Sequence, residues 1–228
     1  MVGTVPVRRS SDALDGFTPP VPADVAARAE ALSDGGRPVE PRPSASVVLL
    51  RDGVDPAHGV EVYLMHRHDR MPFAPSVAVF PGGGVDPADS AADDPVQACA
   101  LRETAEETTV RLRADDLVPW ARWVTPAAEP RRYDTTFYLA ALPADQEARD
   151  VSGETVRAAW TSVRVALEAR KAGDLALMPP TWSILREVAA APDVATLLRL
   201  GAGRRVETVL PRVVRHEGGW RFAYEVLA

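Results

Sequence analysis

This sequence has almost no cysteine, no long apolar run and no excess of positive charge. Its 228 residues include one cysteine, Cys99, so no internal disulfide can form and a reducing compartment is expected. No run approaches the roughly 18 apolar residues of a membrane-spanning helix. Lys and Arg number 26 against 32 Asp and Glu, a net charge of −6 that disfavours general nucleic-acid and anionic-membrane binders. The first residues lack the apolar stretch of a secretory signal, so we expect a cytoplasmic protein.

What the sequence does contain is the composition of a folded domain. Apolar residues make up 46% and charged residues 25%, which suits a chain that buries a core without disulfides. Residues 1–42 are polar and proline-punctuated with one short helix, and we interpret them as an N-terminal arm. Residues 43–228 mix strands and helices without a regular βαβ rhythm. This pattern predicts an α/β domain with a mixed sheet packed by helices.

Turn residues and apolar periodicity place the individual elements. Strands are expected at 45–50, 60–66, 76–80, 120–124, 133–142 and 156–161, followed by a hairpin within 205–226. Helices are expected at 23–32, 95–108, 163–171, 181–190 and 193–200. Gly82-Gly83-Gly84 is interpreted as a glycine turn between a strand and a helix. The apolar side of residues 181–200 is explained equally well by a core position and by a homodimer contact.

The clearest chemical signal is a charged segment at residues 102–107. At about 100° per residue, a helix with Glu103 at 0° has Glu106 near −60° and Glu107 near +40°. The three carboxylates therefore share a stripe about 100° wide. The other side of the helix is expected to pack on the sheet, and it carries small or apolar residues: Ala98, Leu101, Ala105 and Thr108.

Three glutamates on one stripe repel one another, and a divalent cation would offset that repulsion. Mg²⁺ and Mn²⁺ prefer carboxylate oxygens and substrate phosphates as ligands. Arg102 is expected to hold a carboxylate by a forked hydrogen bond. The glycine run lets the backbone pass close to a ligand or metal. A tight turn followed by a solvated helix explains either feature alone, but the two in this order favour a metal site. No His/Cys spacing suits zinc, and Cys99 is interpreted as a packing residue.

These residues resemble the box of the Nudix family. That box is a glycine, five residues, Glu, seven residues and then Arg-Glu-U-x-Glu-Glu-x-Gly-U, where U is apolar. The second half here reads Arg102-Glu103-Thr104-Ala105-Glu106-Glu107-Thr108-Thr109-Val110. Thr109 replaces the box glycine, which removes an easy left-handed end to the helix. Counting from Gly83 puts the first acidic position at Asp89, whereas counting back from Arg102 puts it at Asp94, and both remain candidates.

The resemblance covers most of residues 45–185, and it is similar in particular to the Nudix branch of the acyl-coenzyme A diphosphatases. Segments such as VFPGGGVDPAD and WARWVTPAAEPRRYDTTFYLAALP carry it. It implies an α/β/α sandwich that cleaves a nucleoside diphosphate linked to another group, here with a C-terminal helical extension added. It also implies a Mg²⁺ or Mn²⁺ ion held by Glu103, Glu106, Glu107 and the carbonyl of Gly82, with Arg102 orienting a glutamate.

Basic residues are the candidates for binding substrate. Coenzyme A-directed members carry an arginine-containing stretch before Phe-Pro-Gly-Gly, and this chain has Arg67 and Arg70 before such a segment. Arg131 and Arg132 form a second basic pair within the region of resemblance. Arginine forks match phosphate geometry, so these four are expected to meet phosphates such as the 3′-phosphate of coenzyme A. A solvated strand end or loop is the alternative explanation.

The resulting hypothesis is a metal-dependent hydrolase that cleaves a diphosphate linkage in a nucleotide conjugate such as coenzyme A or acyl-coenzyme A. A bound divalent ion acidifies a water, and a further carboxylate takes its proton. Glu154 and Glu103 are the two candidates for this base, although Glu154 is also explained as a solvated turn residue. Two alternatives stay open: a dinucleotide or nucleotide-sugar diphosphatase, and a Nudix-fold binding or regulatory module with weak catalysis.

Overall fold

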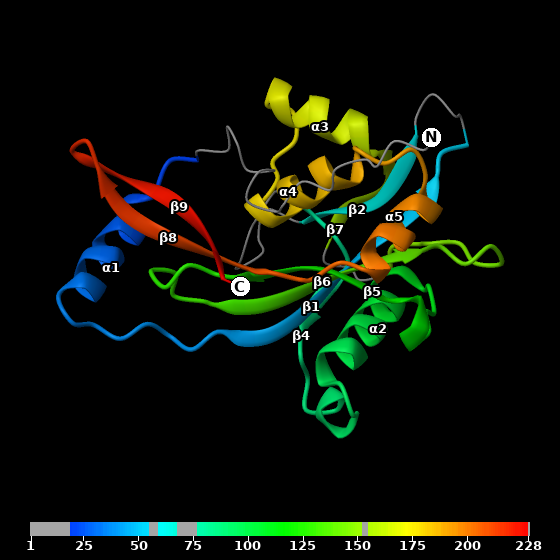
Figure 1. The fold of residues 1–228 in the computed structure, drawn as a ribbon, viewed down its shortest axis with the longest axis horizontal. Helices are drawn as coiled ribbons and strands as arrows, with labels where there is room; N and C mark the ends of the chain where they lie inside the picture. Colours follow the sequence, from blue (N-terminus) through cyan, green and yellow to red (C-terminus); the bar gives the residue numbers. More distant parts are fainter. Residues whose placement is uncertain (1–18, 55–58, 68–76, 152–154, 228) are drawn as a thin grey trace.

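The computed structural model describes residues 19–54, 59–67, 77–151 and 155–227. Its centre is one mixed sheet of nine strands (Figure 1). The strands are β1 Arg42–Asp52, β2 Val60–Arg67, β3 Ala78–Val79, β4 Gly82–Gly84, β5 Val118–Val124, β6 Tyr133–Ala141, β7 Thr155–Ser162, β8 Thr208–His216 and β9 Gly219–Leu227. The main order is β3-β2-β1-β6-β5-β8-β9, with β4 beside β1 and β7 beside β2.

Helices cover both faces of this sheet. They are α1 Ala23–Ser33, α2 Pro95–Thr108, α3 Val163–Ala172, α4 Pro179–Val188 and α5 Val194–Ala202. Alternation along β1 divides the core: Val47 and Leu49 pack with α2, whereas Val48 and Leu50 pack with α3, α4 and α5. The predicted α/β/α sandwich with a mixed sheet is therefore confirmed. No helix of the described residues is long and apolar enough to span a membrane.

The pairing directions explain why β1 is buried on both faces. β1 is parallel to β6 from Arg42 to Leu50 and antiparallel to β2 at its far end. A central strand with helices over both faces has apolar residues on both of its sides. This explains why the segment Val47–Leu50 is continuously apolar and does not alternate with polar residues. The hairpin expected between the first two strands is confirmed, although β1 begins at Arg42, before the predicted start.

Two predictions about the glycine run and the following helix are wrong. The glycines are not a turn: they form β4, which pairs antiparallel with β1. The buried positions of α2 are Cys99, Ala100, Thr104 and Thr108, whereas Ala98, Leu101 and Ala105 are only partly buried. The helix is rotated because Glu103 and Glu107 point toward β4, so its buried side includes part of the glutamate stripe.

The ends of α2 follow from local chemistry. Asp94 caps the first turn, its Oδ1 accepting hydrogen bonds from the backbone N–H groups of Val96 and Gln97, both at 3.0 Å. Pro95 occupies the first helical position, as the sequence predicts. Thr109 ends the helix in the left-handed region at φ 66°, and its N–H donates to Ala105 O at 3.0 Å. The glycine-type stop is therefore present without a glycine, at a conformational cost for a β-branched residue.

The first described helix and the last hairpin meet away from α2. The C-terminal extension is not only helical, because α4 and α5 are followed by the β8–β9 hairpin, which joins the sheet through β5. Helix α1 lies beside this hairpin (Figure 1). Val25 and Ala29 of α1 are buried against Ala128, with Val213 and Trp220 of the hairpin packed around them. We call α1 together with β8 and β9 the terminal assembly.

Candidate active site

The glycine strand is held against β1 by the backbone and by one serine. Pro81 O accepts hydrogen bonds from Val47 N–H at 2.8 Å and from Ser46 Oγ at 2.9 Å. Beyond it, a Cβ on Gly82 would lie 2.3 Å from the carbonyl oxygen of Ala45. A side chain cannot occupy that space, so Gly82 is required for β4 to lie this close to β1.

Two glutamates of α2 reach this strand. Glu107 Oε2 accepts a hydrogen bond from Gly82 N–H at 2.8 Å. Glu103 lies over Gly83, where a Cβ would approach its Oε1 to 2.2 Å. Burial raises the pKa of Glu103, although its hydrogen bond with Arg102 acts in the opposite direction.

Arg102 links the glutamates to the loop before the helix. Its Nε and Nη2 donate to the two carboxylate oxygens of Asp89 at 3.0 and 2.8 Å, forming a fork. Its Nη1 donates to Glu103 Oε1 at 2.9 Å and to Glu106 Oε2 at 3.0 Å. Arg102 Nη2 also donates to Gly84 O at 3.2 Å. One guanidinium therefore contacts three carboxylates and β4, and the forked hydrogen bond expected of Arg102 is present in the structure.

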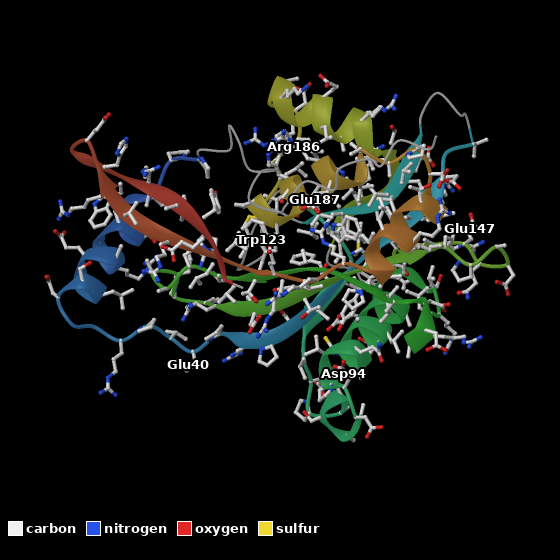
Figure 2. The ribbon with its side chains drawn as sticks, in the orientation of Figure 1. Glu40, Asp94, Trp123, Glu147, Arg186 and Glu187 are labelled. Carbon is white, nitrogen blue, oxygen red and sulfur yellow. The ribbon has the colours of Figure 1, made fainter. Side chains whose placement is uncertain are left out.

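The geometry distinguishes the two aspartates that counting left open. Asp89 belongs to the short 3-10 helix η3 Asp89–Ala91, and its side chain is 4% exposed. It also accepts a hydrogen bond from Asp86 N–H at 2.8 Å. The Arg102 fork is the main reason that the pKa of Asp89 lies below its ordinary value. Asp94 instead caps α2, and Figure 2 shows it at the loop end of that helix.

We call residues 81–108 the glutamate corner. Figure 2 also places Glu187 on the opposite side of the sheet from this corner, with α4.

Within the corner, Cys99 is fully buried and its Sγ donates to Gly83 O at 3.4 Å. Burial is the main reason that the pKa of Cys99 rises to about 11. A neutral buried thiol agrees with the packing role expected from the sequence.

The predicted phosphate-binding arginines have different environments. Arg132 is buried, and its guanidinium donates to Val39 O at 2.6 Å and to Thr125 O at 3.1 Å. These contacts commit it to joining the β5–β6 loop to the segment before β1, which argues against a phosphate contact. Arg131 is exposed in the same loop. The backbone of Arg67 ends β2, while Arg70 lies outside the described residues.

Registers place these segments at one end of the sheet. Arg42 N–H donates to Arg132 O at 2.9 Å, and Ser44 of the same strand pairs with Gly84. The β5–β6 loop therefore lies near the glycine strand. Glu154 lies outside the described residues. Just before it, Val151 N–H donates to Glu107 O at 3.2 Å, which ties that segment to the end of α2.

The fit of a divalent cation can be judged from the donors. Carboxylate oxygens of Glu103, Glu106 and Glu107 and the nearby glycine backbone are the ligand types that Mg²⁺ and Mn²⁺ prefer. Their present arrangement is different: the first two glutamates contact Arg102, and the third accepts from Gly82. Within the described part of the chain, no group of three such side chains is positioned to hold a metal ion. The donor set thus fits the metal, and the glutamates must rearrange to bind it.

Comparisons with known proteins agree on one family. The family model for the NUDIX domain matches residues 40–179. "Putative nudix hydrolase 7" of Caenorhabditis elegans is 29% identical over 58% of this chain and 57% of its own length, so the match spans little more than half of that relative. A NUDIX hydrolase from Alicyclobacillus acidocaldarius has a TM-score of 0.63 and 27% identity, covering 71% of this chain and 96% of that one.

A second solved structure shows likeness of fold alone. The NUDIX domain of Shewanella oneidensis NrtR, solved in complex with ADP ribose, has a TM-score of 0.50 and 16% identity. It covers 71% of this chain and 96% of that one. In this chain, α5 and the β8–β9 hairpin follow the end of the matched family region at residue 179.

Proposed function

The chain belongs to the Nudix family, and we propose that it is a diphosphatase that hydrolyses a nucleotide conjugate with the help of Mg²⁺ or Mn²⁺. The observation that carries this proposal is the Arg102–Asp89 fork beneath the glutamate stripe. This fork holds Arg102 and the glutamates of α2 against the glycine strand. It does so although the loop between that strand and α2 is longer than in the family pattern and carries aspartates in place of the first box glutamate. A helix that was merely solvated would not need this buried carboxylate.

Each residue of the corner then has a role. Glu103, Glu106, Glu107 and the carbonyl of Gly82 would hold the cation, which when bound neutralises the diphosphate and acidifies a water. Arg102 positions Glu103, because its Nη1 donates a hydrogen bond to Glu103 Oε1 at 2.9 Å. We assign to Asp89 the part of the box glutamate, because it fixes the other edge of Arg102.

The proton acceptor is proposed to be Glu103 or Glu154. Burial raises the pKa of Glu103, which favours uptake of a proton from water. The case for Glu154 is that Arg149 N–H and Val151 N–H donate to Thr108 O and Glu107 O, at 2.9 and 3.2 Å. These bonds hold the preceding segment at the end of α2. Comparing kcat in Glu103→Gln and Glu154→Gln across pH 5–9 separates the two, since loss of the base removes the rise in rate from acidic to neutral pH.

For the substrate we propose coenzyme A or an acyl-coenzyme A, with dinucleotides and nucleotide sugars as the second choice. The support is local: Arg131 is exposed in a loop at the same end of the sheet as Gly84, and the backbone of Arg67 ends β2 beside β3. Arg132 is left out of this proposal, because its guanidinium is committed to backbone carbonyls. A forked arginine–phosphate contact contributes about 1.5–3 kcal/mol.

A panel of diphosphates with Mg²⁺ and with Mn²⁺, read by product mass, tests the proposal. Coenzyme A, its 3′-dephospho form, NADH and ADP-ribose are the informative members. Coenzyme A should exceed its dephospho form by about ten- to a hundredfold in kcat/KM. Arg131→Ala or Arg67→Ala should remove most of that gap, whereas Arg199→Ala on α5 should not. Equal rates for the two forms, or faster cleavage of NADH, would favour the second choice.

A binding module with weak catalysis is the remaining alternative. Two departures from the family box, the missing glycine and the long loop, supported this alternative. The structure compensates for both, because Thr109 takes the left-handed conformation and Asp89 accepts hydrogen bonds from Arg102. These observations favour the enzyme. Tight binding of a nucleotide diphosphate without turnover of any panel member would instead identify a binding module.

A further inference from the structure

One cation already lies among the carboxylates of the glutamate corner, and it is the guanidinium of Arg102. Its Nη1 is shared between Glu103 Oε1 at 2.9 Å and Glu106 Oε2 at 3.0 Å. Both glutamates are metal ligands in the function proposed above, on which this inference rests. The remaining ligand, Glu107, accepts a hydrogen bond from Gly82 N–H instead. The negative charge that a metal would neutralise is therefore partly neutralised by the chain itself.

The two edges of this guanidinium differ in how firmly they are held. The Nε–Nη2 edge forms a fork with Asp89, whose side chain is 4% exposed and is also fixed by Asp86 N–H. The Nη1 edge makes one hydrogen bond to Glu103, whose side chain is 17% exposed, and one to Glu106, whose side chain is 59% exposed. Exposed ion pairs are weak, and water can replace them at little cost. The Nη1 edge, which holds each glutamate by a single hydrogen bond, can therefore exchange its partners while the fork with Asp89 stays in place.

We propose that Arg102 competes with the divalent metal for Glu103 and Glu106, with Asp89 keeping the arginine in place while its Nη1 edge releases them. No covalent bond changes in this exchange: the carboxylates pass from one cation to another. The arginine stabilises the metal-free chain by offsetting repulsion between glutamates one turn apart. That stabilisation is lost when the metal enters, so it weakens metal binding by the same amount.

A purely orienting role for Arg102 predicts the opposite result. If the arginine only holds Glu103 in a metal-binding rotamer, its removal frees that side chain and weakens metal affinity. If it competes, its removal leaves the carboxylates without a cation and strengthens the affinity. The sign of the change in Mn²⁺ affinity therefore decides between the two roles, and neither role needs to be inferred from activity.

Mn²⁺ binding to the metal-stripped full-length protein, measured by the electron paramagnetic resonance of free Mn²⁺ without nucleotide, is the test. We expect Arg102→Gln to bind Mn²⁺ about three- to tenfold more tightly than the wild type, and Arg102→Lys to lie between them, because lysine keeps the charge but loses the fork. Arg199→Gln removes the same charge from α5, on the other face of the sheet, and should leave the affinity within twofold. A lowered melting temperature of Arg102→Gln in chelator, recovered with Mn²⁺, is also expected.

The outcomes separate this inference from the proposed function. Unchanged or weaker Mn²⁺ affinity in both Arg102 variants, with far-UV spectra like the wild type, overturns the competition while the diphosphatase proposal stands. Equal tightening in Arg199→Gln also overturns it, because net charge alone would then explain the effect. A wild-type chain that binds no Mn²⁺ at millimolar concentration overturns both. If Arg102→Gln does not fold, Arg102→Lys decides by the same sign.

Discussion

The glutamate corner and the terminal assembly are built from opposite kinds of contact. The side-chain hydrogen bonds between corner residues join near neighbours in the chain, such as Arg102 with Asp89, and the longest of them, Gly82 with Glu107, spans 25 positions. In the terminal assembly, Arg28 donates to Ala128 O across 100 positions, and Arg215 pairs with Glu30 across 185. The first region is polar and glycine-rich, while the second is a small apolar cluster. The polar contacts within the corner are thus local in sequence, although β4 itself pairs with β1, whereas the terminal assembly depends on long-range contacts.

The largest loss of activity is expected from the carboxylates of the corner. Glu106→Gln or Glu107→Gln should lower kcat by about a hundredfold, equivalent to about 2.7 kcal/mol of transition-state stabilisation, because a charged metal ligand is lost. The measurement is kcat at saturating Mg²⁺, with the far-UV spectrum as the check on folding. Glu168→Gln, an exposed glutamate on α3, is the matched control and should keep the wild-type rate. Wild-type turnover in a folded Glu107→Gln protein would refute the assigned role.

Two adjacent glycines of β4 have different surroundings. A Cβ on Gly83 would lie 2.2 Å from Glu103 Oε1, whereas a Cβ on Gly84 would have nothing within 4 Å. Gly83→Ala should therefore displace Glu103 and lower kcat/KM by about tenfold or more. Gly84→Ala should change it less than twofold. Measuring kcat/KM for the two variants side by side tests this. Equal losses would show that the rate depends on β4 as a whole and not on the position of Glu103.

Removal of α1 tests the other region. Deleting residues 1–38 should leave kcat/KM within tenfold, about 1.4 kcal/mol, because in the described structure Arg28 and Glu30 of α1 bond to Ala128 and Arg215, away from the corner. The melting temperature should fall by about 5 °C, since Val213 and Trp220 lose their cover. Deleting residues 1–18 alone keeps α1 and should preserve the melting temperature. A larger kinetic loss in the longer deletion would mean that the arm completes the active site.

The smallest expected effect concerns backbone strain in each region. Thr109 and Glu217 both have positive φ, 66° and 43°. Thr109→Gly should raise the melting temperature by about 2–4 °C, because left-handed backbone costs a β-branched residue about 1 kcal/mol. Glu217→Gly, in the two-residue turn at the tip of the β8–β9 hairpin, should raise it by less, since the Glu217 side chain is 85% exposed and its turn is lightly packed. Calorimetry on both variants measures the difference. A loss of stability in Thr109→Gly would show that its 3.3 Å hydrogen bond to Glu147 O outweighs the strain.

Much of the fold and part of the corner could be predicted from the sequence. The order of strands and helices and the start of α2 at Pro95 were predictable because caps and apolar periodicity are local signals. The charged segment at 102–107 could be recognised equally well. The assignment of Asp89 was not, because counting along a loop of unusual length cannot tell which carboxylate folds back to meet Arg102. The Asp86–Asp89 turn was the one signal that could have indicated it.

The misreadings have a shared physical origin in long-range packing. Gly82-Gly83-Gly84 carries no strand propensity and becomes β4 only because β1 offers an unpaired edge at Ser44–Ser46. The rotation of α2 follows from that placement, since the glutamates turn toward the new strand. Arg132 looked like a phosphate ligand beside Arg131, yet its partners Val39 and Thr125 are carbonyls that no sequence motif marks. Tertiary context decides all three.

The buried thiol of Cys99 can report how often the glutamate corner opens. Burial raises the pKa of Cys99 to about 11, so the thiol stays largely protonated at pH 8, and its packed environment slows alkylation. Modification by iodoacetamide therefore requires α2 to lift from β4. Since Cys99 is the single cysteine, the labelling rate of the intact protein counts such openings directly. A ligand that clamps the glutamates onto the glycine strand would slow this rate, so mass spectrometry of alkylation can screen for substrates before any turnover assay exists.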